Sequence, residues 1–441
     1  MKVLMLALNR EKFPDPVFPL GASYIAGALS KAGHIVDVFD ACFLENPQIE
    51  LENFLKGKSY DSIGVSIRNV DNNSFSIAEN YLNYYKSMVD ICRKYSKAPI
   101  TLGGSGFSIF PELYMKELGA DYGIKGEGEY AFLELLKKIE TGDPPAEKLF
   151  YSETIKDINF DTFPDRKGFD IDKYYKYSGC INIQTKRGCA YNCSYCTYPV
   201  LEGRSYRFRS AKNVVDEIEF WNKSKGIDYI FFVDNVFNHP ENYALEICNE
   251  IIRRKLKIKW TGFFTPTLSD NEFIGKCLES GLTSADFGTD AFSPETLKGY
   301  NKSFTVEDIF RSCEICKERG IKFNHSLIFG GPNETMDTLK ETLANVELTA
   351  PTSVIGFIGV RLYAGTQIAE TFKDLDIGIT PVFYISEAVR DEILDYLAEY
   401  VKDKRNWIIP GLEKGTNLSL INRIRNKGVK GPLWELLVNL K

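Results

Sequence analysis

Short apolar runs alternate with helical apolar periods along residues 1–145. Helical periods cover Gly21–Ala32 and a long stretch that follows the third run and ends near Tyr95. Strands that alternate with helices predict a parallel, doubly wound, Rossmann-like α/β sheet. Because ligands of such sheets bind beyond the carboxyl ends of the strands, the Gly-rich turns there are candidate binding elements. The runs predict the strands Lys2–Leu8, His34–Phe39, Ser62–Ser66, Pro99–Leu102 and Tyr122–Lys125.

The alternation stops after residue 145 and restarts at residue 179. Residues 146–178 follow two prolines, are rich in charge and are interpreted as a linker. Amphipathic helices such as Ala211–Lys223 and Val306–Arg319 then separate six strands, which predicts a partial (β/α)6 barrel of TIM type over residues 179–375. Residues 376–441 are expected to form a small helical region that closes the open side of the barrel. The six strands are Ile181–Lys186, Tyr229–Asp234, Lys257–Phe264, Ser284–Gly288, Lys322–Phe329 and Val354–Tyr363.

Composition narrows the class of protein. The chain has 441 residues, 44% of them hydrophobic, which is enough for more than one buried core. The formal net charge of -6 argues against a general nucleic-acid binder. No run reaches the roughly 18 apolar residues that span a bilayer, and the first residues do not read as a signal peptide. We therefore expect a cytoplasmic protein whose ten cysteines stay reduced.

Three of the cysteines stand close together just after the first barrel strand. Cys189, Cys193 and Cys196 have the spacing C-x3-C-x2-C. Three such thiolates can bind three irons of a [4Fe-4S] cluster, and the fourth iron then has no protein ligand. An open coordination position of this kind suits a catalytic metal. The alternatives are a zinc site, which normally needs a fourth ligand, or three unrelated cysteines.

This spacing, with the aromatic Tyr195 before the third cysteine, resembles the signature of the radical S-adenosylmethionine (SAM) superfamily. Two later turns are similar to family turns beside SAM: Gly288-Thr289-Asp290, and Phe329–Thr335, where Asn333 replaces a glycine. Asn tolerates positive φ, so we expect the second turn to survive. Tyr363–Thr366 resembles a third family turn. The resemblance implies that SAM is chelated by the free iron and contacts Tyr195, Asp234, Asp290, Gly330, Gly331 and Glu334. For Asp234, a turn or capping role is equally open.

The first domain resembles the cobalamin-binding domain that precedes the barrel in one branch of this superfamily. Taken alone, its Gly-rich turns also allow a purely structural reading. Together with the barrel, they imply a corrin that approaches the backbone where side chains are small. The residues implied in cobalamin binding are Gly21, Ser66, Arg68, Gly103, Gly104, Gly126, Glu127 and Gly128.

One departure from the family pattern concerns the lower face of cobalt. Many cobalamin domains carry a cobalt-binding His after the first strand, but this chain has Asn9–Phe13 there, without a His. Arg68 is a candidate to face the lower side of cobalt, and a guanidinium is not an ordinary metal ligand. The alternative is that Arg68 pairs with Asp71 or with a surface carboxylate.

Several other residues could carry chemistry but have simpler interpretations. Cys313 and Cys316 lie on a helical period and are expected to pack in the core. His325 lies within a strand, where a catalytic or a packing role is open. The arginines that follow the cysteines, Arg204, Arg207 and Arg209, are expected by default to form a solvated basic stretch, and the alternative is that Arg207 or Arg209 holds a carboxylate or the cobalamin.

The resemblance implies a cobalamin-dependent C-methyltransferase that acts on a small molecule or natural-product precursor. In that reading, a 5′-deoxyadenosyl radical takes hydrogen from an unactivated carbon and methylcobalamin supplies the methyl group. An electron donor such as flavodoxin or ferredoxin is the implied partner. Two alternatives remain: a rearrangement, cyclisation or ring contraction that uses the same cofactors, and a non-catalytic cofactor carrier. No motif identifies the substrate.

Overall fold

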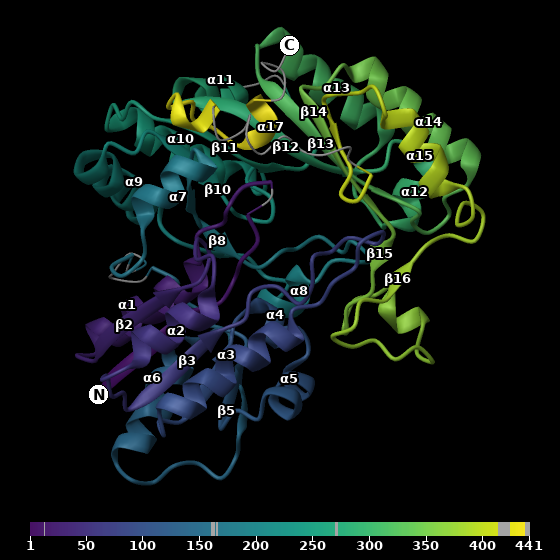
Figure 1. The fold of residues 1–441 in the computed structure, drawn as a ribbon. Coiled ribbons are helices and arrows are strands. Elements are labelled where there is room, and N and C mark those ends of the chain that lie inside the picture. Colours follow the sequence, from purple (N-terminus) through teal and green to yellow (C-terminus); the bar gives the residue numbers. More distant parts are fainter. Residues whose placement is uncertain (13, 160–163, 165, 270–271, 413–423, 437–441) are drawn as a thin grey trace.

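The computed structural model describes all residues except 13, 160–163, 165, 270–271, 413–423 and 437–441. The chain folds into two lobes (Figure 1). The lower lobe is built on a six-stranded sheet and the upper lobe on a curved, seven-stranded sheet. Along the described residues, no helix has the length and apolar character needed to cross a membrane.

The first sheet is parallel throughout, with the strand order β2-β1-β3-β4-β5-β6. Leu51, Met88 and Tyr114 pack helices α2, α3 and α5 on one face, while Leu29 and Phe132 pack α1 and α6 on the other. The predicted doubly wound sheet is therefore confirmed. Its elements are β1 Lys2–Ala7, α1 Leu20–Lys31, β2 Ile35–Asp40, α2 Pro47–Leu55, β3 Ser62–Ser66, α3 Leu82–Tyr95, β4 Ile100–Gly103, α4 Ser105–Ile109, α5 Pro111–Leu118, β5 Tyr122–Lys125, α6 Gly128–Glu140 and β6 Leu149–Tyr151.

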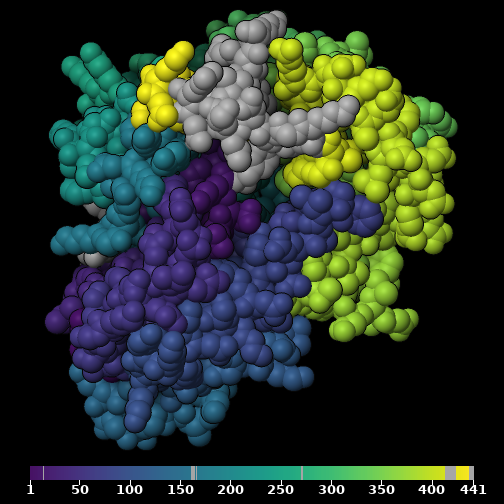
Figure 2. Space-filling view, viewed as in Figure 1, coloured from purple at the N-terminus to yellow at the C-terminus, as the bar shows by residue number. Residues whose placement is uncertain are grey.

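The predicted helix after β3 begins later than the apolar period indicates. Residues 67–81 form a loop, because Asn73 has a positive φ of 49° and its N–H donates to the Asp71 carboxylate at 2.9 Å. The loop extends to the C-terminal region, where Phe75 packs edge-on against Phe383 at 5.7 Å between ring centroids. In Figure 2 this violet-blue segment lies against the yellow-green chain. The loop therefore bridges the two lobes.

The segment predicted as a linker also contains regular structure. Strand β6 extends the first sheet, and helix α7, Ile171–Ser178, leads into the barrel. The side chain of Asp170 caps this helix by accepting a hydrogen bond from the Lys173 N–H at 2.9 Å.

The second sheet confirms the predicted barrel. Its strand order is β17-β14-β13-β12-β11-β10-β7, in which β17 is Trp407–Ile408, and all pairs are parallel. Helices cover its outer face (Figure 1). The elements are β7 Ile181–Ile183, α9 Ala211–Lys225, β10 Tyr229–Phe232, α10 Glu241–Arg253, β11 Lys259–Phe264, α11 Glu272–Glu279, β12 Leu282–Asp290, α12 Pro294–Gly299, α13 Val306–Glu318, β13 Lys322–Phe329, α14 Met336–Thr349 and β14 Ser353–Ile358.

Two predicted barrel strands are interrupted. The first continues as β8, Lys186–Arg187, which pairs antiparallel with β9, Arg207–Phe208, around the cysteine loop and helix α8, Tyr198–Glu202. The sixth breaks at Gly359, whose φ is 76°, and a Cβ there would meet Ile385 at 3.1 Å. Beyond the break, β15, Val360–Arg361, pairs antiparallel with β16, Phe383–Tyr384.

The C-terminal region is less helical than predicted. It contains the helices α15, Ile393–Val401, and α17, Leu433–Leu436, but β16 and β17, Trp407–Ile408, are strands, and the 3₁₀ helix η1, Ala369–Thr371, precedes the region. Strand β17 lengthens the barrel sheet beside β14.

The end of the described chain also contacts the first lobe. Arg425 forms a buried ion pair with Asp15 of the β1–α1 loop, at 2.9 Å between Nη2 and Oδ1. Burial raises the pKa of Asp15 to about 6, and the guanidinium opposes that rise. The loop after β1 is therefore fixed by residues from the far end of the chain.

Candidate cofactor site at the lobe junction

The cysteine loop is fixed by backbone contacts before any ligand binds. Gly188, with φ 88°, starts it, and a Cβ there would meet the Ser205 carbonyl at 2.2 Å. The N–H of Ser194 donates to the Tyr300 carbonyl at 3.0 Å, and the Ile368 N–H donates to the Ser194 carbonyl at 2.8 Å. Barrel turns on both sides thus set the position of the thiols.

The three thiols lie together, as the spacing predicts. Each of Cys193 and Cys196 is close enough to Cys189 for their charges to interact, and burial together with these neighbours raises the pKa of Cys196 to about 12. Among the described residues, no three His, Cys, Asp or Glu side chains are placed to hold a single metal ion. A cluster fits the site, because its irons are separate and each thiolate binds its own.

A lysine that the sequence analysis did not single out lies beside the thiols. The Lys302 ammonium is 3.8 Å from the Cys193 sulfur and 2.5 Å from the Asp290 carboxylate. The Tyr195 hydroxyl donates a hydrogen bond to the same carboxylate. Burial alone would lower the pKa of Lys302, but Asp290 and Cys193 together raise it. The ammonium is therefore charged, and Tyr195 and Asp290, both predicted SAM residues, are in contact.

The predicted turn after β13 places a free carboxylate oxygen beside the strand end. Glu334 is 1% exposed, one oxygen accepts from the Gly330 N–H, and the other, Oε1, is buried without a hydrogen-bond partner among the described residues. Burial raises the pKa of Glu334 to about 7, while the Gly330 and Gly331 amides oppose the rise. Asn333 has φ 65°, as expected. An orphaned carboxylate oxygen of this kind fits an ammonium group such as that of SAM.

Asp234 does not share that environment. Its two oxygens accept hydrogen bonds from the Thr185 N–H at 2.7 Å and the Thr185 hydroxyl at 2.5 Å, and the Lys186 N–H also donates to it. These bonds fix the turn between β7 and β8, just before the cysteine loop. The turn role is the one that its contacts support, and its SAM contact stays a prediction.

Small residues stand at the carboxyl ends of the central strands of the first sheet. Ser66 and Gly103 are register partners on β3 and β4, and nothing lies within 4 Å of a Cβ built on Gly21. Gly104, with φ 102°, passes so close to Ile67 that a Cβ would meet its carbonyl at 2.5 Å. A flat corrin therefore fits against this edge.

A cavity of about 190 Å³ opens beside this edge, between the first sheet and the chain after the cysteines. Helix α8, which directly follows the third cysteine, also contacts α4 at the end of β4. The thiols and the first sheet's carboxyl edge therefore face one junction. The cavity is lined by Ser108, Lys125, Gly126, Glu127, Tyr151, Ser152, Thr154, Pro199, Val200, Leu201 and Gly203.

The Gly126-Glu127-Gly128-Glu129 turn contributes two carboxylates to ion pairs at the junction. Arg187 pairs with Glu129 at 2.6 Å, and Arg207 pairs with Glu127 at 2.7 Å. These side chains are at most 10% exposed. The interpretation of Arg207 as part of a solvated stretch is wrong, and its buried pair with Glu127 of the first lobe supports the alternative that it holds a carboxylate. A cobalamin contact of Gly126, Glu127 and Gly128 stays a prediction.

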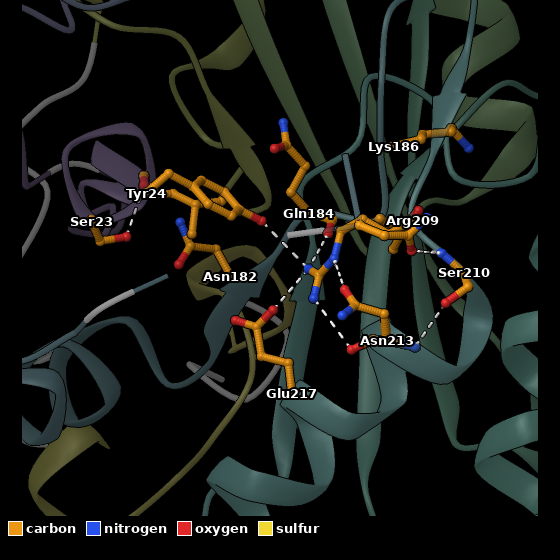
Figure 3. A network of polar contacts seen from close by, with 12 residues as sticks. Ser23, Tyr24, Asn182, Gln184, Lys186, Arg209, Ser210, Asn213 and Glu217 are labelled. Atoms are coloured by element: carbon orange, nitrogen blue, oxygen red, sulfur yellow. Dashed lines mark hydrogen bonds and ion pairs between the residues drawn. The ribbon is translucent and has the colours of Figure 1, made fainter. Parts of the chain in front are cut away.

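Arg209 is buried in the same way (Figure 3). Its guanidinium donates to Glu217 of α9 at 2.8 Å and to the Gln184 carbonyl at 2.7 Å, with the Tyr24 hydroxyl of α1 at 3.4 Å. Arg166 pairs with the other oxygen of Glu217 at 3.2 Å, and both side chains are at most 1% exposed. The solvated reading is therefore wrong for Arg209 too, whereas Arg204 is exposed.

Arg68 and Asp71 are not partners. Asp71 pairs with Arg361 at 2.8 Å between Nε and Oδ2, and both are buried. Arg68, which follows β3, is exposed and donates to the Asn69 side chain at 2.9 Å. Within the described part of the chain, no carboxylate forms an ion pair with Arg68. The Asp71 alternative is wrong, and Arg68 is left at the strand end.

The remaining candidates are packing residues. The His325 ring is held by Thr289 at 2.8 Å and by Thr349 at 3.1 Å, and burial lowers its pKa to about 3. Cys313 lies 3.7 Å from the same ring. These residues lie between β13 and its covering helices, away from the junction.

Two family models match the chain. The model described as the radical SAM superfamily matches residues 183–346, and the model described as the B12 binding domain matches residues 7–136. The two matches fall on the barrel and on the first sheet.

Two curated relatives differ in how much of this chain they match. The tryptophan 2-C-methyltransferase of Streptomyces laurentii is 24% identical and covers 85% of this chain and 75% of its own length. The anaerobic magnesium-protoporphyrin IX monomethyl ester cyclase of Rubrivivax gelatinosus is 29% identical and covers 55% of this chain and 47% of its own length.

The fold matches a solved structure over nearly its full length. The radical SAM methyltransferase TsrM from Kitasatospora setae, with tryptophan and a SAM analogue bound, has a TM-score of 0.89 at 23% identity and covers 99% of this chain and 98% of its own. Its form with cobalamin and a [4Fe-4S] cluster has a TM-score of 0.88 at 22% identity, with 99% and 97% coverage.

Proposed function

We propose that this chain, which joins a B12-binding domain to a radical SAM domain, is a cobalamin-dependent radical SAM enzyme that methylates a carbon of a small molecule. The observation that carries the proposal is the meeting of two sites at one junction. The three thiols stand on one side, and the small-residue edge of the first sheet stands on the other. The relatives that act as methyltransferases support the reaction class.

When bound, the cluster, SAM and cobalamin supply the electron, the radical and the methyl group, and the chain supplies orientation. Cys189, Cys193 and Cys196 would hold the cluster. Glu334 offers its free oxygen to an ammonium group. Tyr195 and Lys302, joined through Asp290, form a rigid wall next to the thiols. The paired arginines of the junction exclude water between the lobes.

A second candidate function uses the same cofactors without net methylation. The cyclase relative is the more similar of the two by identity, although it matches about half of this chain. Deoxyadenosine with a rearranged or cyclised product would favour this candidate over methylation. The non-catalytic carrier is set aside, because the three thiols and the turns that fit SAM are all in place.

The electron donor is a proposal of the same kind. A flavodoxin or ferredoxin is the chemical class that reduces such a cluster, and the proposal places the enzyme in the cytoplasm, where thiols stay reduced. A role in nucleic-acid binding is not proposed, because the net charge is -6.

Anaerobic reconstitution with iron, sulfide and cobalamin tests the proposed function. The expected result is about four irons per chain, followed by formation of S-adenosylhomocysteine and of a product heavier by one methylene when SAM and candidate substrates are supplied. Cys193→Ala should abolish the cluster absorbance and SAM consumption. Cys92→Ala, which removes a buried thiol of α3, is the matched control and should leave both unchanged. A wild-type protein that binds cobalamin and cluster but never consumes SAM would overturn the proposal.

Arg68 is proposed to face the lower side of cobalt. Its exposed guanidinium has no carboxylate partner among the described residues and follows β3 at the corrin edge. Electron paramagnetic resonance of bound cob(II)alamin should then lack the splitting of a nitrogen ligand. Arg68→His should introduce that splitting, whereas Arg10→His, on the neighbouring loop, should not. Nitrogen splitting in the wild type would contradict the assignment.

A further inference from the structure

The inner face of the barrel is less covered than its outer face. Along β13, Phe323, His325, Leu327 and Phe329 are 0–3% exposed, because they pack under the helices. Ser326 and Ile328, which point the other way, are partly exposed. The same alternation occurs on β14, where Ile355 and Phe357 are partly exposed. Solvent therefore reaches the inner face.

Two aromatic rings lie on that inner face. Phe263 of β11 is 36% exposed, although Trp260 and Phe264 of the same strand are 0% and 1% exposed on the outer face. Its ring meets that of Phe231 on β10 edge-on, with 5.0 Å between centroids. An exposed ring pair inside a barrel offers a flat apolar surface to a ligand.

Asp286 lies next to these rings and has no cation. It is the register partner of Phe263 on the neighbouring strand β12 and is 5% exposed. One oxygen, Oδ1, accepts from Asn324 at 2.8 Å and from Ser326 at 3.0 Å. Among the described residues, Oδ2 has no hydrogen-bond partner and no ion pair reaches the carboxylate. A buried carboxylate without a counterion is costly unless a ligand supplies one.

The floor beneath Asp286 is closed. Thr261 and Ser284 hydrogen-bond each other at 2.8 Å, and Ser284 also reaches Glu435 of α17 at 2.5 Å. Asn324 bonds Ser353 on β14 at 2.8 Å. Asp286 precedes Asp290 by four residues on a strand that rises toward the cofactor site, a separation of roughly 13 Å. The inner face therefore opens toward the thiols and not toward the other end of the barrel.

We propose that the barrel's inner face binds a flat aromatic substrate that carries a cationic nitrogen, with Asp286 as its counterion and Phe231 and Phe263 as its stacking surface. This inference rests on the proposed function, since it names the substrate class of the same site. An ammonium or amidinium donates to the free oxygen of Asp286 and is attracted by the ring faces. A carboxylate in that position would be repelled.

Three probes that share a naphthyl group and differ in charge test the proposal. They are 2-naphthylmethylamine, 2-naphthylmethanol and 2-naphthoate, bound by the full-length protein with cluster, cobalamin and SAM and measured by equilibrium dialysis. The amine should bind at least about tenfold more tightly than the alcohol, and the carboxylate most weakly. Asp286→Asn should remove the preference for the amine and leave the alcohol unchanged. Asp37→Asn, which removes the same charge from β2 of the first lobe, should keep the wild-type ranking.

The outcomes separate the two proposals. Equal binding of amine and alcohol by the wild type, or an unchanged preference in Asp286→Asn, overturns the substrate class. If Asp286→Asn does not fold, the wild-type ranking and Phe263→Leu decide, because the latter should weaken all three probes by a similar factor of about five. Iron, cobalamin and SAM content are measured in the same samples. A protein that binds neither SAM nor cobalamin overturns the proposed function instead.

Discussion

Buried charges are matched at the lobe junction and unmatched inside the barrel. Glu217 pairs with both Arg166 and Arg209, and Arg187 pairs with Glu129, so each of these buried charges has a counterion. Glu334 and Asp286 are only 1% and 5% exposed, yet neither has a cation among the described residues. In the first set, the pair of Arg187 and Glu129 joins the barrel to the first lobe. The second set destabilises the protein until a cationic ligand binds.

This difference separates structural from functional carboxylates by a physical criterion. A paired carboxylate stabilises the protein that surrounds it. Its removal leaves the partner cations buried without a counterion. An unpaired one destabilises the empty protein and gains from a ligand. Substitutions at the two places should therefore change stability with opposite signs.

The largest effect is expected at the junction. Glu217→Ala should lower the free energy of unfolding by about 3–5 kcal/mol, because it leaves Arg166 and Arg209 buried without a counterion. Urea denaturation followed by circular dichroism measures the change. A loss below 1 kcal/mol would mean that solvent enters the junction and that the comparison fails.

A substitution of Glu334, in the turn after β13, is expected to change the free energy of unfolding with the opposite sign. The size of this change depends on pH. The folded protein holds the pKa of Glu334 near 7, above the ordinary value of 4.5, so ionisation destabilises the fold as pH rises through this range. At pH 8, Glu334→Gln should stabilise the cofactor-free protein by at most about 3 kcal/mol, and below pH 4.5 by nothing. Denaturation at pH 5 and pH 8 measures the difference. Glu341→Gln, on the exposed side of α14, should show no such dependence, and a constant gain at both pH values would refute the explanation.

A smaller effect is expected beside the thiols, on the midpoint potential of the cluster. The Lys302 ammonium lies 3.8 Å from the Cys193 sulfur and favours the reduced, more negative cluster. Lys302→Met should lower the cluster midpoint potential by about 60 mV, which corresponds to one charged hydrogen bond for a one-electron couple. A redox titration monitored by electron paramagnetic resonance measures it. Lys298→Met, on the exposed side of α12, should leave the potential unchanged, and an equal shift in both variants would exclude a local cause.

The smallest effect on stability is expected for an ion pair that is exposed to solvent. Lys212 pairs with Asp216 at 2.7 Å, but its side chain is 76% exposed. Lys212→Ala should change the free energy of unfolding by less than about 0.5 kcal/mol. A loss comparable to that of Glu217→Ala would show that pairing matters here regardless of burial.

Local patterns account for what the sequence predicts correctly. The two sheets follow from alternating periods, and the cysteine loop follows from a spacing of a few residues. Asn333 takes the positive φ expected of it because that preference belongs to the residue itself. The breaks in two strands were missed, since Gly359 reads as a strand residue until Phe383 and Ile385 pack against it.

Contacts between distant segments account for what the sequence does not show. Lys302 is separated from Cys193 by 109 positions, and no spacing rule connects them. Arg207 reads as a solvated charge because its partner, Glu127, lies 80 positions earlier in the other lobe. Asp286 sits in an ordinary strand, and only the register with Phe263 reveals an unpaired acid beside an exposed ring.

The ion pair between Asp15 and Arg425 has a consequence for biosynthesis. Ribosomes release the first lobe long before residue 425 emerges, so the loop after β1 lacks its anchor while that lobe is being made. The order of translation therefore delays this contact between the first lobe and the C-terminal region until the polypeptide is almost entirely synthesised.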